Sequence, residues 1–231
     1  MSHYLVSFLV SFLSSTTIVI LLNGFIIEAD KNSVKDIKSQ RVYWRHNLTI
    51  ENQFVDQNNI NTIIKRINIP KKLGLLSLDI DGIDYWVLKK LSVLEPSIVI
   101  CEYNSLFGQK KAITVPYKNN YIRSNEHFSN LFYGASIRAF INLLKKRNYF
   151  FIGTNSAGNN AFFVKQNIWK KINKLITDKK IFESKFRESR NSNGKLTFLN
   201  KKKSLQLIKN KIVIDLKNNK KTKLFELGLF N

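Results

Sequence analysis

The sequence is poor in the residues that form covalent cross-links and thiolate or imidazole metal sites. Its 231 residues include one cysteine and three histidines. Cys101 therefore has no partner within the chain for a disulfide, and the scattered histidines give no zinc-binding spacing. Since Cys101 lies inside an apolar run, we expect a small buried side chain in a reducing compartment.

Acidic residues are also scarce, with 16 Asp and Glu against 38 Lys and Arg and a net charge of +22. Residues 165–231 hold 19 of the basic residues and 5 of the acidic ones, so this segment carries +14 and the rest +8. Such a segment indicates either a solvated surface or a polyanion site. Its lysine runs at residues 201–203 and 220–221 have no interleaved aromatic residues for base stacking, so we do not expect nucleic-acid binding.

Residues 4–27 lack any charge, and they are long enough to span a bilayer. They also lack the basic start and the small-residue cleavage site of a secretory signal. Two interpretations stay open. Residues 4–22 are a membrane anchor, or the apolar stretch leads into a buried strand at residues 24–27. We prefer the strand, which predicts a cytoplasmic protein, whereas the anchor predicts membrane association.

The most informative stretch is LGLLSLDIDGIDYWVLKKLSVLEPSIVICEYN. An apolar run at residues 75–78 ends in Asp79 and Asp81, and a second run at residues 98–101 ends in Glu102. Between the runs, large residues recur near helical spacing: Tyr85, Trp86, Leu88 and Leu91. The pattern predicts a strand–helix–strand unit with acids at the carboxyl ends of two parallel strands. Ligands bind at that edge in open α/β sheets.

Periodicity and turn residues predict the remaining elements of an α/β fold. Further strands are expected at residues 24–30, 42–50, 149–154, 161–164 and 212–216. Helices are expected at residues 31–39, 59–67 and 132–147, followed by one or two Lys-rich amphipathic helices after residue 165. The strands at 149–154 and 161–164 flank an Asn- and Gly-rich turn, which predicts a hairpin. Residues 109–130 are too long for an ordinary connection, so we expect a functional loop or lid.

Several segments resemble one family. LLSLDIDGIDYWVLKKL is similar to the signature of FkbM-like class I S-adenosylmethionine-dependent methyltransferases, and GFIIEADKNSVKDIK is similar to the second strand of that fold. CEYNSLFG, TVPY, YGAS, NSAGNNAFFV and the tail FRESRNSNGKLTF resemble a less characterised branch. The resemblance spans about residues 24–200. It implies a Rossmann-like, mostly parallel class I methyltransferase sheet closed by an antiparallel hairpin.

The chain departs from the family before GFIIEAD. The family's first strand and glycine-rich cofactor loop belong there, but residues 1–23 contain no glycine. We therefore expect an N-terminally incomplete sheet with a gap between the family's second and fourth strands, which residues 17–22 are candidates to fill. The expected organisation is an apolar segment at 1–23, a methyltransferase-like α/β domain at 24–165 and a basic, mainly helical extension at 166–231.

The resemblance implies S-adenosylmethionine as cofactor and methylation of a hydroxyl group on a sugar or another polar acceptor. By the same resemblance, Glu28 or Asp30 is expected to bind the ribose hydroxyls, because carboxylates accept hydrogen bonds from both. Asn52 is a candidate for the adenine side. Solvated loop acids and a turn-forming Asn52 are the alternatives.

Asp79 and Asp81 are the candidate catalytic residues, together with Glu102. Two residues apart on an extended segment, the aspartates point to the same side. Such a pair can share a proton or hold a divalent cation through oxygen ligands, and Glu102 can complete a three-carboxylate site. The alternative is that these acids cap the following helix or balance nearby lysines.

Amide and ring side chains near the same edge are candidates for binding the acceptor substrate. Asn104, Asn155 and Asn160 each offer both donors and an acceptor, with turn formation as the alternative. Tyr85 is a candidate pocket-lining residue. His127, in the expected lid, is a candidate base or substrate ligand, and a surface histidine is the alternative.

Two further classes of function remain beside the enzyme. One is a non-catalytic interaction protein that retains the scaffold without the cofactor site. The other is a membrane-anchored basic protein. The missing glycine-rich loop favours the first of these rivals, and the uncharged start of the chain favours the second.

Overall fold

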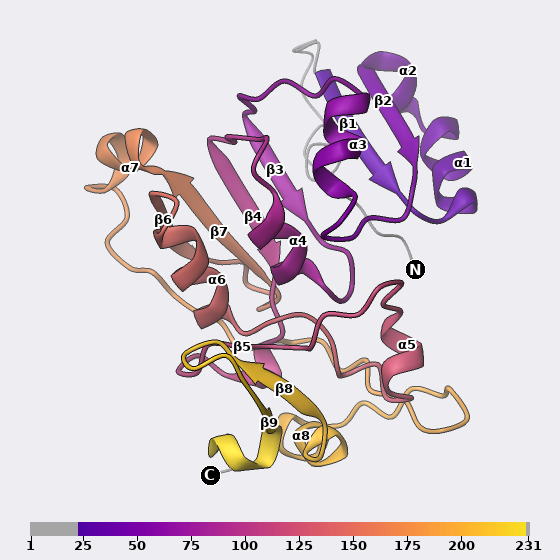
Figure 1. Cartoon of the computed structure of the whole chain (residues 1–231), viewed down its shortest axis with the longest axis vertical. Helices are drawn as coiled ribbons and strands as arrows, with labels where there is room; N and C mark the ends of the chain where they lie inside the picture. The colour runs from indigo at the N-terminus through magenta and orange to yellow at the C-terminus, as the bar shows by residue number, and fades with distance from the viewer. Residues whose placement is uncertain (1–22, 230–231) are drawn as a thin grey trace.

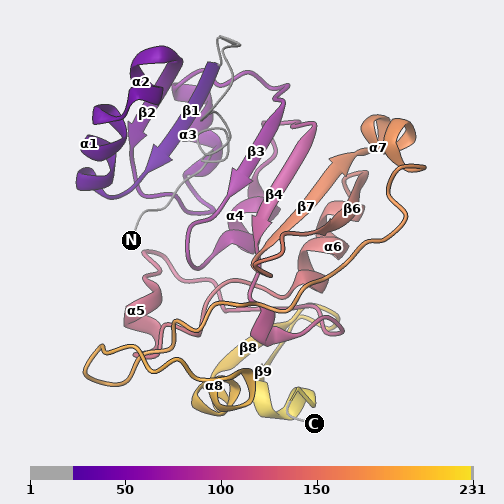
Figure 2. The same cartoon turned by 180° about the vertical axis from the view of Figure 1, so that it is seen from behind.

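The computed structural model describes residues 23–229, and Figures 1 and 2 show it from opposite sides. Its strands are β1 (Asn23–Glu28), β2 (Asn47–Asn52), β3 (Leu75–Leu78), β4 (Ile98–Glu102), β5 (Ile113–Thr114), β6 (Tyr149–Thr154), β7 (Asn160–Lys165), β8 (Ile212–Asp215) and β9 (Lys220–Lys223). Its helices are α1 (Lys31–Ser39), α2 (Arg41–Arg45), α3 (Ile60–Arg66), α4 (Asp84–Lys90), α5 (Arg123–Glu126), α6 (Ile137–Lys145), α7 (Gln166–Ile172) and α8 (Lys201–Ile208), with 3₁₀ turns η1 (Ser105–Phe107) and η2 (Leu224–Leu227). The expected mixed α/β fold is confirmed.

Parallel pairs and an antiparallel hairpin build the main sheets. β3 pairs with β4 in parallel, and β4 continues antiparallel to β7 and then β6, giving the order β3-β4-β7-β6. β1 and β2 form a second parallel pair. The carboxyl ends of β1, β2, β3 and β4 all point toward the half of the molecule that holds α5 and the small sheet (Figure 1). The closing hairpin is therefore confirmed, as is the parallel strand–helix–strand unit with its acids at one edge.

Among the described strands, β1 shares no ladder with β3. This is where the sequence predicts a missing strand. Residues 17–22, the expected filler, lie outside the described residues, as does the anchor candidate at residues 4–22. One apolar core still runs beneath both sheets, because Ile27 of β1 and Leu76 of β3 belong to the same buried cluster. No helix within residues 23–229 is both long and apolar enough to cross a membrane.

Helices α3, α4 and α6 lie on one face of the strands (Figures 1 and 2). The apolar side of α6, with Phe140 and Leu144, is buried in the core as the periodicity predicts. The helix begins at Ile137, later than expected, because the Ser136 hydroxyl accepts a hydrogen bond from the Ala139 amide (3.2 Å) and caps it there. Residue 135 instead bridges to β5.

The strand expected at residues 42–50 is wrong over its first half. Residues 41–45 form α2, and β2 begins at Asn47. Val42, Tyr43 and Trp44 have strand propensity, but β2 pairs in parallel with β1 from Asn47 onward, so the preceding residues belong to the crossover. None of the α2 residues is buried, so tertiary packing gives them no strand environment.

The mainly helical extension at residues 166–231 is a second correction. Within the described residues 166–229, α7 and α8 are the α-helices and η2 adds a 3₁₀ turn; residues 173–200 form no helix, and β8 and β9 join β5 in an antiparallel sheet. The strand expected at 212–216 is confirmed as β8. Its partner β5 lies about a hundred positions away, inside the long segment 109–130, so local periodicity does not reveal the pairing.

Candidate functional site

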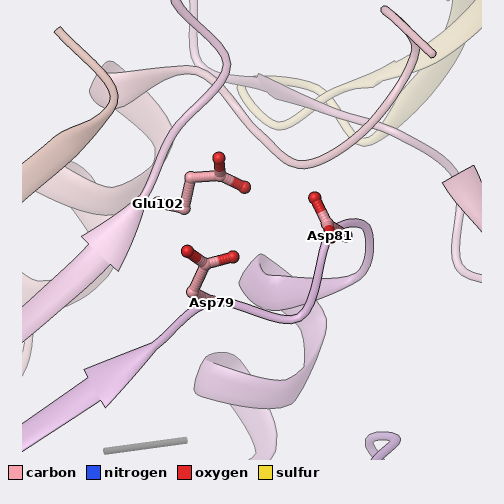
Figure 3. A group of neighbouring side chains, drawn as sticks. All are labelled: Asp79, Asp81 and Glu102. Carbon is pink, nitrogen blue, oxygen red and sulfur yellow. The ribbon is translucent and has the colours of Figure 1, made fainter. Parts of the chain in front are cut away.

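The carboxylates of Asp79, Asp81 and Glu102 meet beyond the carboxyl ends of β3 and β4. One oxygen of each lies within 4.8 Å of the others, and Figure 3 shows the three side chains directed into a shared space. The β3–β4 register pairs Leu78 with Cys101, so the residues that follow, Asp79 and Glu102, come side by side. The structure thus brings together the three residues that the sequence marks as catalytic candidates.

A buried fourth acid, Asp84, holds the turn that carries the aspartates. Its two carboxylate oxygens accept hydrogen bonds from the backbone amides of Ile80 (2.8 Å) and Gly82 (3.0 Å). Position 82 has room only for glycine, because a Cβ there would lie 2.2 Å from Cδ1 of Tyr121. Asp81 sits between these anchors with φ +55°, a conformation that aspartate tolerates better than most residues.

Arg123 completes the cluster from α5, within the segment expected to be a lid. Its Nη1 donates to Oδ1 of Asp81 at 2.9 Å, and its Nε donates to the carbonyl of Asn130. The guanidinium lies 3.7 Å above the ring centre of Tyr133. Local sequence patterns do not single out Arg123; the available signal is a basic residue in the long polar segment 109–130 of a chain whose acids gather at one sheet edge.

Burial and neighbouring negative charges raise the pKa values of Asp79, Asp84 and Glu102. Burial, with the charges of Asp84 and Asp81 added, raises the pKa of Asp79 to about 7. Burial raises the pKa of Asp84 to about 6 and, together with the neighbouring aspartates, that of Glu102 well above its usual range. Because the negative charges repel one another, ionisation of one of these three carboxyl groups disfavours ionisation of the others.

A polar pocket of about 360 Å³ opens onto Glu102 and Arg123. Its walls come from the residues after β4, from the stretch around Leu131 and Tyr133, and from the C-terminal segment 183–204. Charged side chains of both signs lie in the C-terminal wall: Glu183, Arg187, Glu188 and Lys201. The basic extension therefore supplies one wall of the pocket.

Asn104 lines this pocket, and its side chain is fixed by the protein. Nδ2 donates to the carbonyls of Leu131 and Tyr133, each at 3.0 Å, and Oδ1 accepts from the amide of Leu106 at 3.0 Å. All of its strong donors and acceptors have partners within the chain. Asn104 thus shapes the wall by tying β4 to the segment that follows residue 130.

Among the asparagines of the β6–β7 turn, Asn155 stabilises the turn and Asn159 lines the pocket. Oδ1 of Asn155 accepts hydrogen bonds from the amides of Gly158, Asn159 and Asn160 (3.0–3.1 Å), which is the turn-forming alternative. Asn160 stands opposite Glu102 in the β4–β7 ladder. Of this group, the residue that lines the pocket is Asn159.

Tyr85 and His127 lie away from the pocket lining. Tyr85 is buried on α4 and packs edge-on against Trp86 and Phe140, because its helical position faces the core. Nδ1 of His127 lies 2.7 Å from the Ser129 hydroxyl, and burial, followed by the charge of a nearby lysine, lowers the pKa of the imidazole.

The acidic side chains at the carboxyl end of β1 accept hydrogen bonds from the protein itself. Oε1 of the buried Glu28 accepts from the amide of Asp30 (2.7 Å), and Oδ2 of Asp30 accepts from both the amide and the hydroxyl of Ser33 (2.8 Å each). Asp30 thereby caps α1, and the hydrogen bond from the Ser33 amide lowers the pKa of its carboxyl. Asn52 donates to the carbonyls of Glu28 and Ala29 and so joins the ends of β1 and β2.

The cavity beside these residues is small. It lies between the ends of β1 and β2 and the turn after β3, and its walls include Ala29, Ile80 and Tyr121. Its volume is about 10 Å³, which is roughly the space needed for one water molecule. The described residues therefore do not form a pocket that fits S-adenosylmethionine at this position.

Comparison with models of protein families, with curated proteins and with solved structures finds no match for this chain. The resemblance to FkbM-like methyltransferases therefore stays a prediction. The geometry of the carboxylate cluster and its polar pocket carries the functional argument.

Proposed function

We propose that the protein is an S-adenosylmethionine-dependent transferase that methylates a hydroxyl group of a sugar or another polar acceptor. The observation that carries this proposal is the meeting of Asp79, Asp81 and Glu102 beyond two parallel strands, next to a polar pocket. That edge is where α/β sheets bind ligands and assemble catalytic groups. The volume of about 360 Å³ lies within the range of small-molecule sites.

The pocket chemistry supports a hydroxyl-rich acceptor. Its C-terminal wall contains the ion pair between Lys201 and Glu183 (2.7 Å), and its inner end contains Arg123 and Glu102. The lining contains both hydrogen-bond donors and acceptors, which suits a ligand whose hydroxyl groups both donate and accept. An apolar acceptor would displace water from these charged groups without offering them hydrogen bonds.

The carboxylates supply the base that such a reaction needs. A hydroxyl group becomes a competent nucleophile when its proton passes to a positioned base with a pKa near the working pH. Burial raises the pKa of Asp79 to about 7, and Glu102, which lines the pocket, lies beside it. The acceptor proton would pass to a carboxylate oxygen of this pair, while Arg123 holds Asp81 in position.

Isothermal titration of S-adenosylmethionine into the folded protein tests the methyl-donor part of the proposal. We expect saturable heat with a stoichiometry near one. Absence of heat at about 1 mM cofactor, the weak end of the affinities enzymes use, would remove the methyltransferase assignment. Circular dichroism of the same sample establishes that the protein is folded.

A second candidate function is a non-catalytic binding protein that retains the scaffold. The specific observation in its favour is the cofactor side, where Glu28, Asp30 and Asn52 bond to the chain itself beside a cavity of about 10 Å³. This candidate predicts no heat with S-adenosylmethionine and direct binding of a polar ligand in the pocket at Glu102. The same titration therefore separates the two functions.

A further inference from the structure

We propose that Asp79, Asp81 and Glu102 bind a divalent cation that prefers oxygen ligands, each carboxylate providing one oxygen. The cation deepens the proposed function, since it would lie beside the acceptor hydroxyl, but its binding is measured without any methyl donor. Three protein ligands leave the remaining coordination positions to water or to the acceptor.

The spacing of the carboxylates fits such an ion. Their oxygens all lie within 4.8 Å of one another. Two oxygens on opposite sides of Ca²⁺, each at about 2.4 Å, are about 4.8 Å apart, and for Mg²⁺ at about 2.1 Å they are about 4.2 Å apart. The limit of 4.8 Å is therefore compatible with Ca²⁺, whereas Mg²⁺ requires every pair of ligand oxygens to lie within about 4.2 Å.

Glu102 provides the independent observation. Only 9% of the residue is exposed, and within the described part of the chain its Oε2 is buried and has no hydrogen-bond partner. Figure 3 shows this carboxylate directed toward Asp79 and Asp81. A buried acceptor without a donor is costly, and other acceptors surround this one. A cation in the shared space would give Oε2 the partner that it lacks.

The charge balance also favours a cation. Asp79, Asp81 and Glu102 stand beside the buried Asp84, and among the described residues Arg123 is the basic side chain that forms an ion pair with the cluster. One guanidinium does not balance these carboxylates when they are ionised, and a divalent ion offsets the excess. Because Glu102 and Arg123 line the polar pocket, the open coordination positions would face it.

The experiment uses the full chain, stripped with EDTA and dialysed, without S-adenosylmethionine. MnCl₂, MgCl₂ and CaCl₂ are titrated separately by calorimetry, and we expect at least one to bind at about one ion per chain with Kd below about 1 mM. The same ion should raise the melting temperature of the wild-type protein. Manganese also allows the bound fraction to be counted by its electron paramagnetic resonance signal.

Glu102→Gln is the principal variant because it keeps the shape of the side chain and removes a ligand charge. We expect its affinity to fall at least about tenfold and the cation-dependent rise in melting temperature to disappear. Asp79→Asn should show the same loss of affinity. It serves as the test variant if Glu102→Gln does not fold. Asp36→Asn removes one exposed acid on α1 and is the matched control, with unchanged cation binding.

Two results would overturn the cation site. One is the absence of saturable binding by all three ions up to about 10 mM in protein that circular dichroism shows to be folded. The other is binding by Glu102→Gln and Asp79→Asn that equals the wild type. Titration of S-adenosylmethionine in EDTA keeps the proposals apart: cation binding without cofactor binding removes only methyl transfer, and the reverse removes only the cation site.

Discussion

Two parallel strands each have an acid-x-acid pair at the carboxyl end, Glu28 and Asp30 at β1 and Asp79 and Asp81 at β3, and the two pairs have different environments. After β1, Asp30 receives hydrogen bonds from Ser33, and the pKa of its carboxyl is lowered. After β3, burial and neighbouring carboxylates raise the pKa of Asp79 to about 7. The same local pattern thus produces a helix cap in one region and a cluster of mutually repelling acids in the other.

The position of the following helix accounts for this difference. α1 begins directly after Asp30, so the amides of its first turn are within reach of that carboxylate. α4 begins later, at Asp84, and Asp84 itself accepts the amides of Ile80 and Gly82. Asp79 and Asp81 are thereby left to project beyond the sheet edge. Asp30 therefore caps α1, whereas Asp84 accepts the amides of Ile80 and Gly82 in place of Asp79 and Asp81.

Removing the acceptor for the turn should produce the largest effect. Asp84→Ala removes the acceptor of the buried Gly82 amide and of the part-buried Ile80 amide, and we expect the free energy of unfolding to fall by about 2–4 kcal/mol. Urea denaturation followed by circular dichroism measures this. Asp36→Ala, on the exposed side of α1, is the control. A loss below about 1 kcal/mol for Asp84→Ala would contradict the role given to its hydrogen bonds.

Gly82→Ala tests the close contact that fixes the same turn. The added methyl group would lie 2.2 Å from the Tyr121 ring, which is held by a hydrogen bond from its hydroxyl to the Phe132 carbonyl (2.6 Å). We expect a loss of about 1–3 kcal/mol from overpacking. In a Tyr121→Ala background the added cost should nearly vanish. Equal costs in both backgrounds would show that another contact excludes the methyl group.

The raised pKa values predict how stability depends on pH in EDTA. The pKa of Asp79 is about 7 in the folded protein and 3.8 in its ordinary state, so the folded protein binds more protons between these values. The free energy of unfolding should therefore fall as pH rises from about 4 to about 7, with a slope below about 1.4 kcal/mol per pH unit for one group. Asp79→Asn should reduce this slope relative to wild type. Identical slopes in the two proteins would contradict the assignment.

The smallest effect is expected at the cap after β1. Asp30→Ala removes the acceptor for Ser33 and should lower the melting temperature by about 2–4 °C, whereas Asp30→Asn should retain most of the cap. Differential scanning calorimetry measures both variants. Neutralising Asp79 should stabilise the protein at neutral pH, because the pKa of that group is raised in the folded state. Stabilisation by Asp30→Asn as well would contradict the difference between the two carboxylates.

The sequence reveals the parts of the site that local patterns encode. The apolar run before Asp79, the helical spacing after it and the run before Glu102 define β3, α4 and β4, and parallel pairing then brings the acids together. The hairpin β6–β7 follows from its turn residues in the same way. These features depend on neighbours in the chain, which is why periodicity finds them.

The rest of the site depends on contacts that no local pattern specifies. Arg123 reaches Asp81 across about forty positions, and the pocket wall at residues 183–204 returns from the far end of the chain. Tyr85 is an error of the other kind, a residue expected in the pocket that lies elsewhere. It follows the acids closely in sequence, but its position on α4 directs the side chain into the core against Phe140. Proximity in sequence overstates some site residues and misses others that tertiary folding supplies.

The separate origins of the two sides of the pocket have an evolutionary consequence. The carboxylate edge is built by consecutive strands and their register, whereas the opposite wall at residues 183–204 belongs to no helix or strand until α8 begins near its end. Substitutions in that wall can accumulate without disturbing the hydrogen-bonded ladder that aligns the acids. Selection for a different pocket ligand would then act on one stretch of chain while the carboxylate cluster is inherited unchanged.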